Sequence, residues 1–168
     1  MNKPVILING TGGCGKDTFI DFCKDLAACR NISTVDRVKE AGRMLGWEGA
    51  KTDRDRKFLS DLKKLAVQYS DHAFRYIVRE IDSFLHDNLY DILFFHSREP
   101  EEIKRFKNIG CSTLLITNSN VEIIKSNYSD GNVLNFDYDY VIDNSGSPEE
   151  LRLKAHEFVR LLMGGDHS

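Results

Sequence analysis

The stretch Gly10 to Thr18, GTGGCGKDT, decides the fold. It follows the short apolar run Val5–Ile8 and precedes a helix-like pattern, so it stands where a strand turns into a helix. Its glycines let backbone N–H groups surround phosphate oxygens, and the partial positive charge of a helix N-terminus favours an anion there. Lys16 can reach the terminal phosphates of a nucleotide. An ordinary glycine-rich turn with a solvated lysine is the simpler alternative, but it leaves the lysine and the correct flanks without a reason.

The rest of the chain alternates short apolar runs with helical patterns. We expect the helix after the loop to end near Arg30. The further strands are expected at 32–35, 91–95, 113–116 and 140–142, and the further helices around 58–69, 74–85, 100–108 and after Ser147. Pro100 suits a first helical position, and Ser147-Pro148-Glu149-Glu150 combines a capping box with a proline at the first turn. The pattern predicts a three-layer α/β fold with a mostly parallel five-stranded sheet and helices on both faces. Such sheets bind ligands at the carboxyl ends of their strands.

Length and composition restrict the class of protein. The 168 residues suit a single domain covering 1–168, and 41% apolar with 29% charged residues is ordinary for a globular protein. A net charge of −3 argues against a broad nucleic-acid-binding face. No apolar run is long enough to span a bilayer, and the start lacks the features of a signal peptide. The four cysteines show neither metal-ligand spacing nor a disulfide framework, so we expect a cytoplasmic protein with no membrane partner.

Asp17 stands where a phosphate loop usually has Ser or Thr, and Thr18 follows it. This ending, Gly15-Lys16-Asp17-Thr18, resembles the loop of the bacteriophage-type deoxynucleoside monophosphate kinases, which belong to the adenylate-kinase-like P-loop kinases. The last segment, Asp139 to Gly146 followed by Glu149-Glu150-Leu151, is similar to the family's C-terminal segment, a pattern shared with dephospho-coenzyme A kinases. Weaker likenesses lie at 38–40, 51–62 and 94–100.

The resemblance implies a P-loop NTPase fold, ATP and Mg²⁺ as cofactors, and phosphoryl transfer to a nucleoside or deoxynucleoside monophosphate. It also implies a helical acceptor-binding insertion at about 39–88 and a short lid-like segment at about 118–137. The residues expected to contact the nucleotide are Gly10, Gly12, Gly13, Cys14, Gly15, Lys16, Asp17, Thr18 and Asn144. For Asn144 a tight turn before the last helix is an equal alternative, and Cys14 is read as a small neutral loop residue.

The expected acceptor-binding residues are basic. Arg98 leaves the carboxyl end of the third strand, where an arginine of the family grips the acceptor phosphate, and a guanidinium matches phosphate with two parallel bonds. Its alternative is a surface arginine paired with a neighbouring glutamate. Arg37 and Lys39 follow the second strand and can converge on the same anion. Arg56 matches the family's helix, although a solvated helix face is the more common explanation for arginines there.

The chain departs from the family at His96, where the family has an aspartate at the end of the third strand. A neutral imidazole is a poor ligand for Mg²⁺, which prefers oxygen. We therefore expect Asp36 and Asp17, together with Thr18, to hold the metal. Lys16, Arg98 and Asp36 are the expected catalytic residues. Two alternatives to a nucleotide kinase stay open: a kinase of another small phosphorylated metabolite, and a nucleotide-binding module with little or no transfer activity.

Overall fold

The computed structural model describes residues 3–121 and 136–164. Its centre is a five-stranded sheet in the order β2-β3-β1-β4-β5, and every pair of neighbours is parallel. The strands are β1 (Val5–Asn9), β2 (Cys29–Ser33), β3 (Ile92–His96), β4 (Ser112–Thr117) and β5 (Tyr140–Asp143). The prediction of a parallel five-stranded sheet is confirmed.

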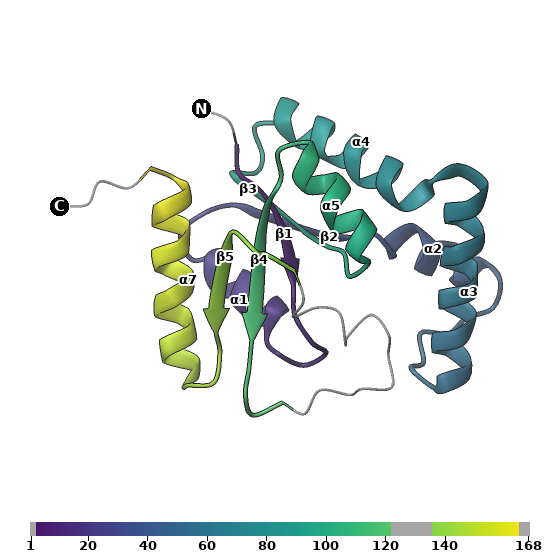
Figure 1. Ribbon diagram of the computed structural model, residues 1–168, viewed down its shortest axis with the longest axis horizontal. Helices are drawn as coiled ribbons and strands as arrows, with labels where there is room; N and C mark the ends of the chain where they lie inside the picture. Colours follow the sequence, from purple (N-terminus) through teal and green to yellow (C-terminus); the bar gives the residue numbers. More distant parts are fainter. Residues whose placement is uncertain (1–2, 122–135, 165–168) are drawn as a thin grey trace.

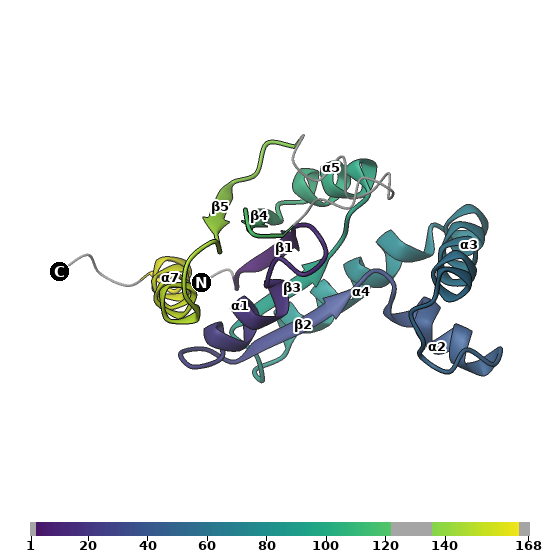
Figure 2. The same ribbon diagram turned by 90° about the horizontal axis from the view of Figure 1, so that it is seen from below.

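Helices cover both faces of the sheet (Figures 1 and 2). They are α1 (Lys16–Cys23), α2 (Asp36–Met44), α3 (Asp53–Ser70), α4 (His72–His86), α5 (Pro100–Asn108) and α7 (Pro148–Leu162). Figure 2 shows α7 at one end of the molecule and the pair α2 and α3 at the other. Most of the expected lid-like segment, 122–135, lies outside the described residues.

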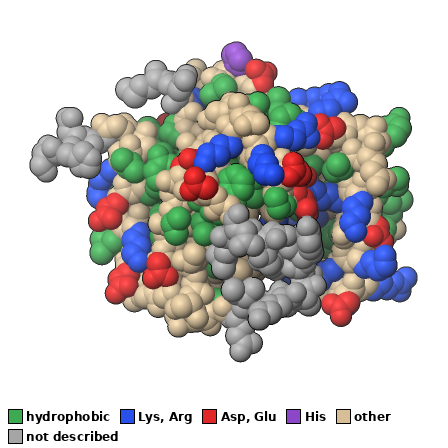
Figure 3. All heavy atoms as spheres, in the orientation of Figure 1, with side chains coloured by type: hydrophobic (Ala, Val, Ile, Leu, Met, Phe, Trp, Pro, Cys, Tyr) green, Lys and Arg blue, Asp and Glu red, His purple; other side chains and the backbone are tan. Residues whose placement is uncertain are grey.

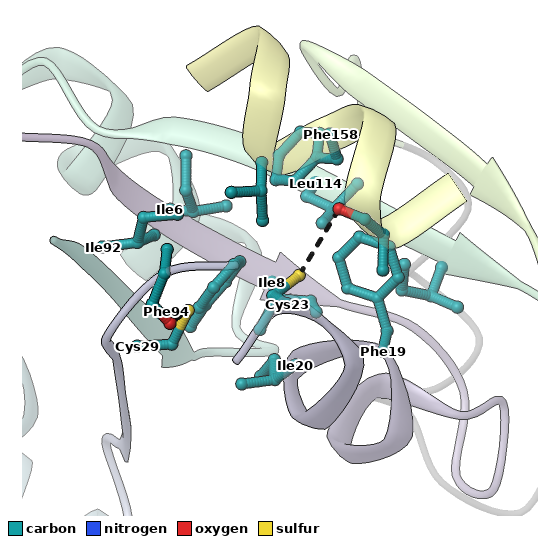
Figure 4. Packing of buried hydrophobic residues seen from close by; sticks show 14 of the residues in the cluster. Ile6, Ile8, Phe19, Ile20, Cys23, Cys29, Ile92, Phe94, Leu114 and Phe158 are labelled. Atoms are coloured by element: carbon teal, nitrogen blue, oxygen red, sulfur yellow. Dashed lines mark hydrogen bonds between the residues drawn. The ribbon is translucent and has the colours of Figure 1, made fainter. Parts of the chain in front are cut away.

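The core consists of two clusters because successive strand residues point to opposite faces of the sheet. Ile6 and Ile8 of β1 pack with Phe19 of α1 and Phe158 of α7 on one face (Figure 4). On the other face, Leu7 packs with residues of β3, α4 and α5, including Phe106. The three inner strands β1, β3 and β4 are thus buried on both faces, which is why they read as nearly continuous apolar runs.

The end of α1 differs from the sequence expectation. The helix stops at Cys23 rather than near Arg30, and β2 lies at Cys29–Ser33 rather than at the expected 32–35. Leu26, which a helix continuing to Arg30 would place on its apolar face, is 46% exposed. Both Leu26 and Ala27 donate backbone hydrogen bonds to the Cys23 carbonyl, which forms a turn. Ala28 N–H donates to the Asp91 carboxylate, and this contact from a residue far along the chain fixes where β2 starts.

The two middle helices, α3 and α4, lie where their patterns predict, but α3 buries none of its residues. Leu65 and Tyr69 belong to the helical apolar pattern at 58–69, yet both are exposed. The helix packs mainly on α2 and α4 at the end of the molecule, so only part of its apolar pattern meets a partner. Asp71 separates α3 from α4 with a left-handed backbone, φ 52°, and accepts two hydrogen bonds from Arg105 of α5.

Two further observations concern the cysteines and the character of the helices. The four cysteines are free and buried, and burial raises the pKa of Cys29 to about 11. Within residues 3–121 and 136–164, no helix has both the length and the apolar character needed to cross a bilayer.

Replacing Phe106 by Ala should lower the free energy of unfolding by about 3–5 kcal/mol, because the ring is fully buried between Phe74 and Phe95 and would leave a cavity. Urea denaturation measures this. Leu65→Ala is the matched control on an exposed position and should change stability by less than about 0.5 kcal/mol. A loss below 1 kcal/mol for Phe106→Ala (compared with the ~3 expected) would contradict this packing.

Candidate functional site: a phosphate loop at the carboxyl edge of the sheet

The loop between β1 and α1 has no room for side chains at two glycines. Gly10 has φ 148°, and a Cβ there would lie 2.5 Å from both the Cys14 Sγ and the Ile116 carbonyl oxygen. Gly15 has φ 98°, and its Cβ would lie 2.3 Å from Nδ2 of Asn144. Asn144 in turn donates from Nδ2 to the Cys14 carbonyl at 2.9 Å. The loop is therefore held against β4 and the end of β5 by contacts that only glycine permits.

The first turn of α1 is open to an anion. Its N-cap, Gly15, supplies no side-chain hydrogen bond, so the first N–H groups of the helix are not capped by a side chain. Lys16 lies over the loop and donates from Nζ to the carbonyls of Gly10 and Thr11, both at 2.8 Å. Burial, aided by the nearby charge of Arg98, lowers the pKa of Lys16, while Cys14 and Asp17 oppose the shift. Uncapped N–H groups beside an ammonium form a site suited to phosphate.

A buried asparagine anchors the start of the loop. Asn9, the last residue of β1, accepts from the Gly10 N–H at 2.8 Å through Oδ1 and donates from Nδ2 to the Tyr138 hydroxyl at 2.9 Å. Burial raises the pKa of Tyr138 to about 12, which keeps that hydroxyl protonated. The sequence pattern gave no signal for Asn9 as a site residue, because it reads as the end of an apolar strand.

His96 ends β3 at the centre of several charged groups. Its pKa is lowered to about 4, first by burial; the Asp17 carboxylate opposes this shift, and three positive charges add to it, those of Lys16, Arg98 and Lys39. These four residues come from α1, the exit of β3, and α2, so the fold brings them to one edge of the sheet. The imidazole is therefore neutral at pH 7. This position carries no charge, whereas the family that the sequence resembles has a carboxylate there.

Asn31 links His96 to Asp17. The neutral ring donates from Nε2 to Asn31 Oδ1 at 2.9 Å, and Asn31 Nδ2 lies 3.4 Å from Asp17 Oδ1 as donor. Asp17 itself is 84% exposed at the first turn of α1. Asn31 was missed by sequence reasoning, since a polar residue inside a short strand carries no signal until β2 is placed beside β3.

The expected metal-binding residues lie at the starts of two different helices, α1 and α2. Asp17 and Thr18 lie next to each other at the exposed start of α1. Asp36 begins α2 and accepts from the Ser33 N–H at 2.7 Å, so one of its oxygens is used by the backbone. Among the described residues, no group of three or more His, Cys, Asp or Glu side chains forms a metal cage. Mg²⁺ at kinase sites is commonly held by one or two carboxylates together with substrate phosphates, and Asp17 with Thr18 fits that mode.

Two of the expected acceptor residues share a groove. A groove of about 290 Å³ lies between α2, α3 and the segment that joins them. Its lining includes Lys39 and Arg43 from α2, Trp47 and Lys51 from the joining segment, and Arg56 from α3. Its lining contains four cationic side chains and no acidic one. Trp47 donates from Nε1 to the Ala50 carbonyl, and the Arg43 guanidinium lies 5.4 Å from the centre of its ring. We call this the cationic groove.

Arg37 is not part of the cationic groove. It pairs with Glu40 at 2.7 Å, and its guanidinium lies 5.4 Å from the centre of the Tyr76 ring in a separate pocket. Arg98 follows Ser97, which is buried and donates to Glu102 at 2.5 Å. Glu102 also pairs with Lys63 of α3 at 3.2 Å. The Ser97–Glu102–Lys63 link joins the exit of β3 to the helical end of the molecule.

The low pKa of His96 gives a pH-dependent stability. The unfolded chain takes up a proton near pH 6.5 and the folded one only near pH 4, so stability is complete above pH 6.5 and falls as the pH drops through this window. Going from pH 7.5 to pH 5 should cost about 2 kcal/mol through this residue. In His96→Gln this part of the loss should disappear, as measured by urea denaturation at both pH values. The exposed His86, changed to Gln, controls for the loss of an imidazole; equal slopes for His96→Gln and the unchanged protein would contradict the burial of a neutral ring.

Comparison with known proteins supports the fold. The sequence matches no protein-family model, and no curated protein matches it significantly. Among solved structures, an unliganded sugar kinase from Janibacter sp. HTCC2649 is similar, with a TM-score of 0.50 and 14% identity over 96% of this chain and 95% of that chain. A GTPase in its apo form from Pyrococcus abyssi has a TM-score of 0.48 and 13% identity over 100% of this chain and 81% of that one. The parallel sheet, the glycine loop and the likeness to the kinase identify the three-layer P-loop NTPase fold.

Proposed function

We propose that this protein is an ATP-dependent kinase that transfers a phosphoryl group to a nucleoside or deoxynucleoside monophosphate. The observation that carries the proposal is the adjacency of two anion-binding features. The glycine loop with Lys16 suits a nucleotide triphosphate, and Lys39, whose charge acts on the same His96 as that of Lys16, also lines the cationic groove. A phosphate donor site at the carboxyl edge of the sheet, and an acceptor groove that Lys39 connects to it, match the needs of phosphoryl transfer.

The lining of the groove favours a phosphorylated acceptor with an aromatic part. Four cationic side chains without an acid favour an anion over a neutral sugar. The Trp47 indole offers a flat apolar surface for a base. The volume of about 290 Å³ is near the lower end of the range for small-molecule sites, roughly 300–1,000 Å³. In this proposal the helical segment at about 39–88 is the acceptor-binding insertion.

The proposal gives the site residues distinct roles. The loop and the uncapped start of α1 hold phosphates of ATP, and Mg²⁺, when bound, neutralises developing charge on them. Asp17, oriented by Asn31, and Thr18 are the proposed metal-side residues, and Asp36 is a further candidate. Arg98, with its charge close to both Lys16 and His96, is proposed to clamp the phosphate between donor and acceptor. Asn144 supports the loop through its hydrogen bond to the Cys14 carbonyl.

Replacing Lys16 by Ala should weaken ATP binding roughly 10- to 100-fold, since a hydrogen bond to a charged group contributes about 1.5–3 kcal/mol. Isothermal titration calorimetry measures the affinity. Lys24→Ala is the matched control, because Lys24 lies on the exposed side of the chain just after α1 and pairs with Asp21. Unchanged ATP affinity in Lys16→Ala would refute the assignment of the loop.

Replacing Arg56 by Gln should raise KM for the monophosphate acceptor by roughly tenfold or more with a smaller change in kcat, because the arginine binds the acceptor before and during transfer alike. The assay supplies ATP, Mg²⁺ and a panel of nucleoside monophosphates and other phosphorylated metabolites. It follows the formation of ADP and of the phosphorylated acceptor, which is a nucleoside diphosphate when the acceptor is a monophosphate. Arg54→Gln, two residues away on α3 and outside the groove lining, is the control. Tight ATP binding with transfer to none of the panel would favour the nucleotide-binding module, an outcome consistent with the neutral His96.

A further inference from the structure

A second pocket lies between α4 and the start of α2, and the proposed function does not use it. It has a volume of about 380 Å³ and shares no lining residue with the cationic groove. Its lining side chains include Arg37 of α2 and, from α4, His72, Arg75, Tyr76, Arg79 and Glu80. The five α4 residues recur at positions i, i+3, i+4, i+7 and i+8 from His72, so they form one face of the helix. We call this the arginine pocket.

The positive charge in this pocket exceeds the negative charge available to it. Glu80 pairs with Arg30 of β2, and Arg37 pairs with Glu40. Arg75 lies near Asp71, but that carboxylate makes two hydrogen bonds with Arg105, and Arg75 donates only a long bond of 3.4 Å to the Ser70 carbonyl.

Arg79 has no ion pair or hydrogen bond with any residue in the described part of the chain. It stands four residues after Arg75 on the same helix face, an arrangement of like charges that is unfavourable in the absence of an anion.

We propose that the arginine pocket binds a small phosphate monoester, separate from the phosphate loop and from the cationic groove. Guanidinium groups from two helices can bind phosphate oxygens in pairs, and Arg79 offers a donor fork that is not paired with the one acid of the lining, Glu80, which binds Arg30. Tyr76 adds an aromatic surface and a hydroxyl to the same space. The volume lies within the range of roughly 300–1,000 Å³ for small-molecule sites and fits a mononucleotide.

The position of the pocket links it to the helical end of the molecule. Arg37 and Lys39 stand two residues apart on α2, which places them about 200° apart around the helix axis, on opposite sides. One side contributes to the arginine pocket and the other to the cationic groove. A phosphate bound between Arg37 and the α4 arginines therefore holds α2 against α4. The site thus goes beyond the proposed transfer reaction and is an effector site for the helix that carries Lys39.

The test is a titration of the full chain with AMP, inorganic phosphate and adenosine, followed residue by residue in ¹H–¹⁵N correlation NMR spectra. AMP and phosphate should shift the amide signals of 70–80, and adenosine alone should not. In the double variant Arg75→Gln/Arg79→Gln the dissociation constant read from these signals should rise at least tenfold. The dissociation constant read from the signals of 10–18 should stay the same. Arg160→Gln, an exposed arginine on α7, is the matched control and should change neither set.

The signals separate this proposal from the proposed kinase function. Shifts confined to 10–18 and 39–59 would overturn the arginine pocket and leave the kinase proposal standing. Shifts at 70–80 that persist unchanged in Lys16→Ala would support the pocket, whatever that variant does to ATP binding. An unchanged dissociation constant at 70–80 in the double variant would overturn a phosphate site built on these arginines. Shifts at 70–80 produced by adenosine alone would overturn it as well.

Discussion

The close approach of the glycine loop to the ends of β4 and β5 is the constraint on which the site depends. Gly10 lies against the Ile116 carbonyl and Gly15 against the Asn144 amide, with no space for a Cβ at either position. With the backbone forced into this turn, the uncapped N–H groups of α1 and the Lys16 ammonium lie together. Because all five strands are parallel, their carboxyl ends share one edge, and the residues that leave β2 and β3 arrive beside the loop. The same turn therefore positions both the candidate phosphate site and the residues from β2 and β3 that lie beside it.

Burial and the charge around that edge account for a neutral histidine at the end of β3. Three cations raise the local potential, and burial removes the water that would stabilise an imidazolium, so His96 stays neutral. A neutral ring leaves the positive potential available to phosphate, whereas a carboxylate would cancel part of it. In the proposed kinase, Asp17 would supply the negative charge near Mg²⁺, and a short chain of hydrogen bonds links this carboxylate through Asn31 to His96. Phosphoryl transfer depends chiefly on positioning and charge neutralisation, so a carboxylate from Asp17 rather than from the end of β3 is chemically reasonable.

Local signals allowed most of the fold to be predicted. Apolar runs marked every strand except β2, Pro100 and Ser147 marked the starts of α5 and α7, and the loop placed the candidate site at the end of β1. What failed depended on contacts between distant residues. The turn after Cys23 is fixed by Asp91, and the exposure of Leu65 follows from the position of α3 at the end of the molecule. Asn31 and the Ser97–Glu102–Lys63 link escaped notice because their meaning depends on which strands and helices are neighbours. Arg37 and Lys39 looked equivalent in sequence, yet the helix turns them to different pockets.

The helical end of the molecule is held differently from the sheet. The sheet is covered by two apolar clusters, whereas α3 buries no residue and is tied to the body by its packing on α4, the Lys63–Glu102 pair and the Asp71–Arg105 pair at the left-handed turn. Basic side chains are prominent over α3 in Figure 3. Segments with few buried apolar contacts open at lower free energy than a core, which suits the proposed role of this part in admitting and releasing an acceptor. Anions bound on the two sides of α2 would each neutralise clustered positive charge there. The position of this end of the molecule would then be governed by ligands more than by packing, because polar links can be remade without opening the core.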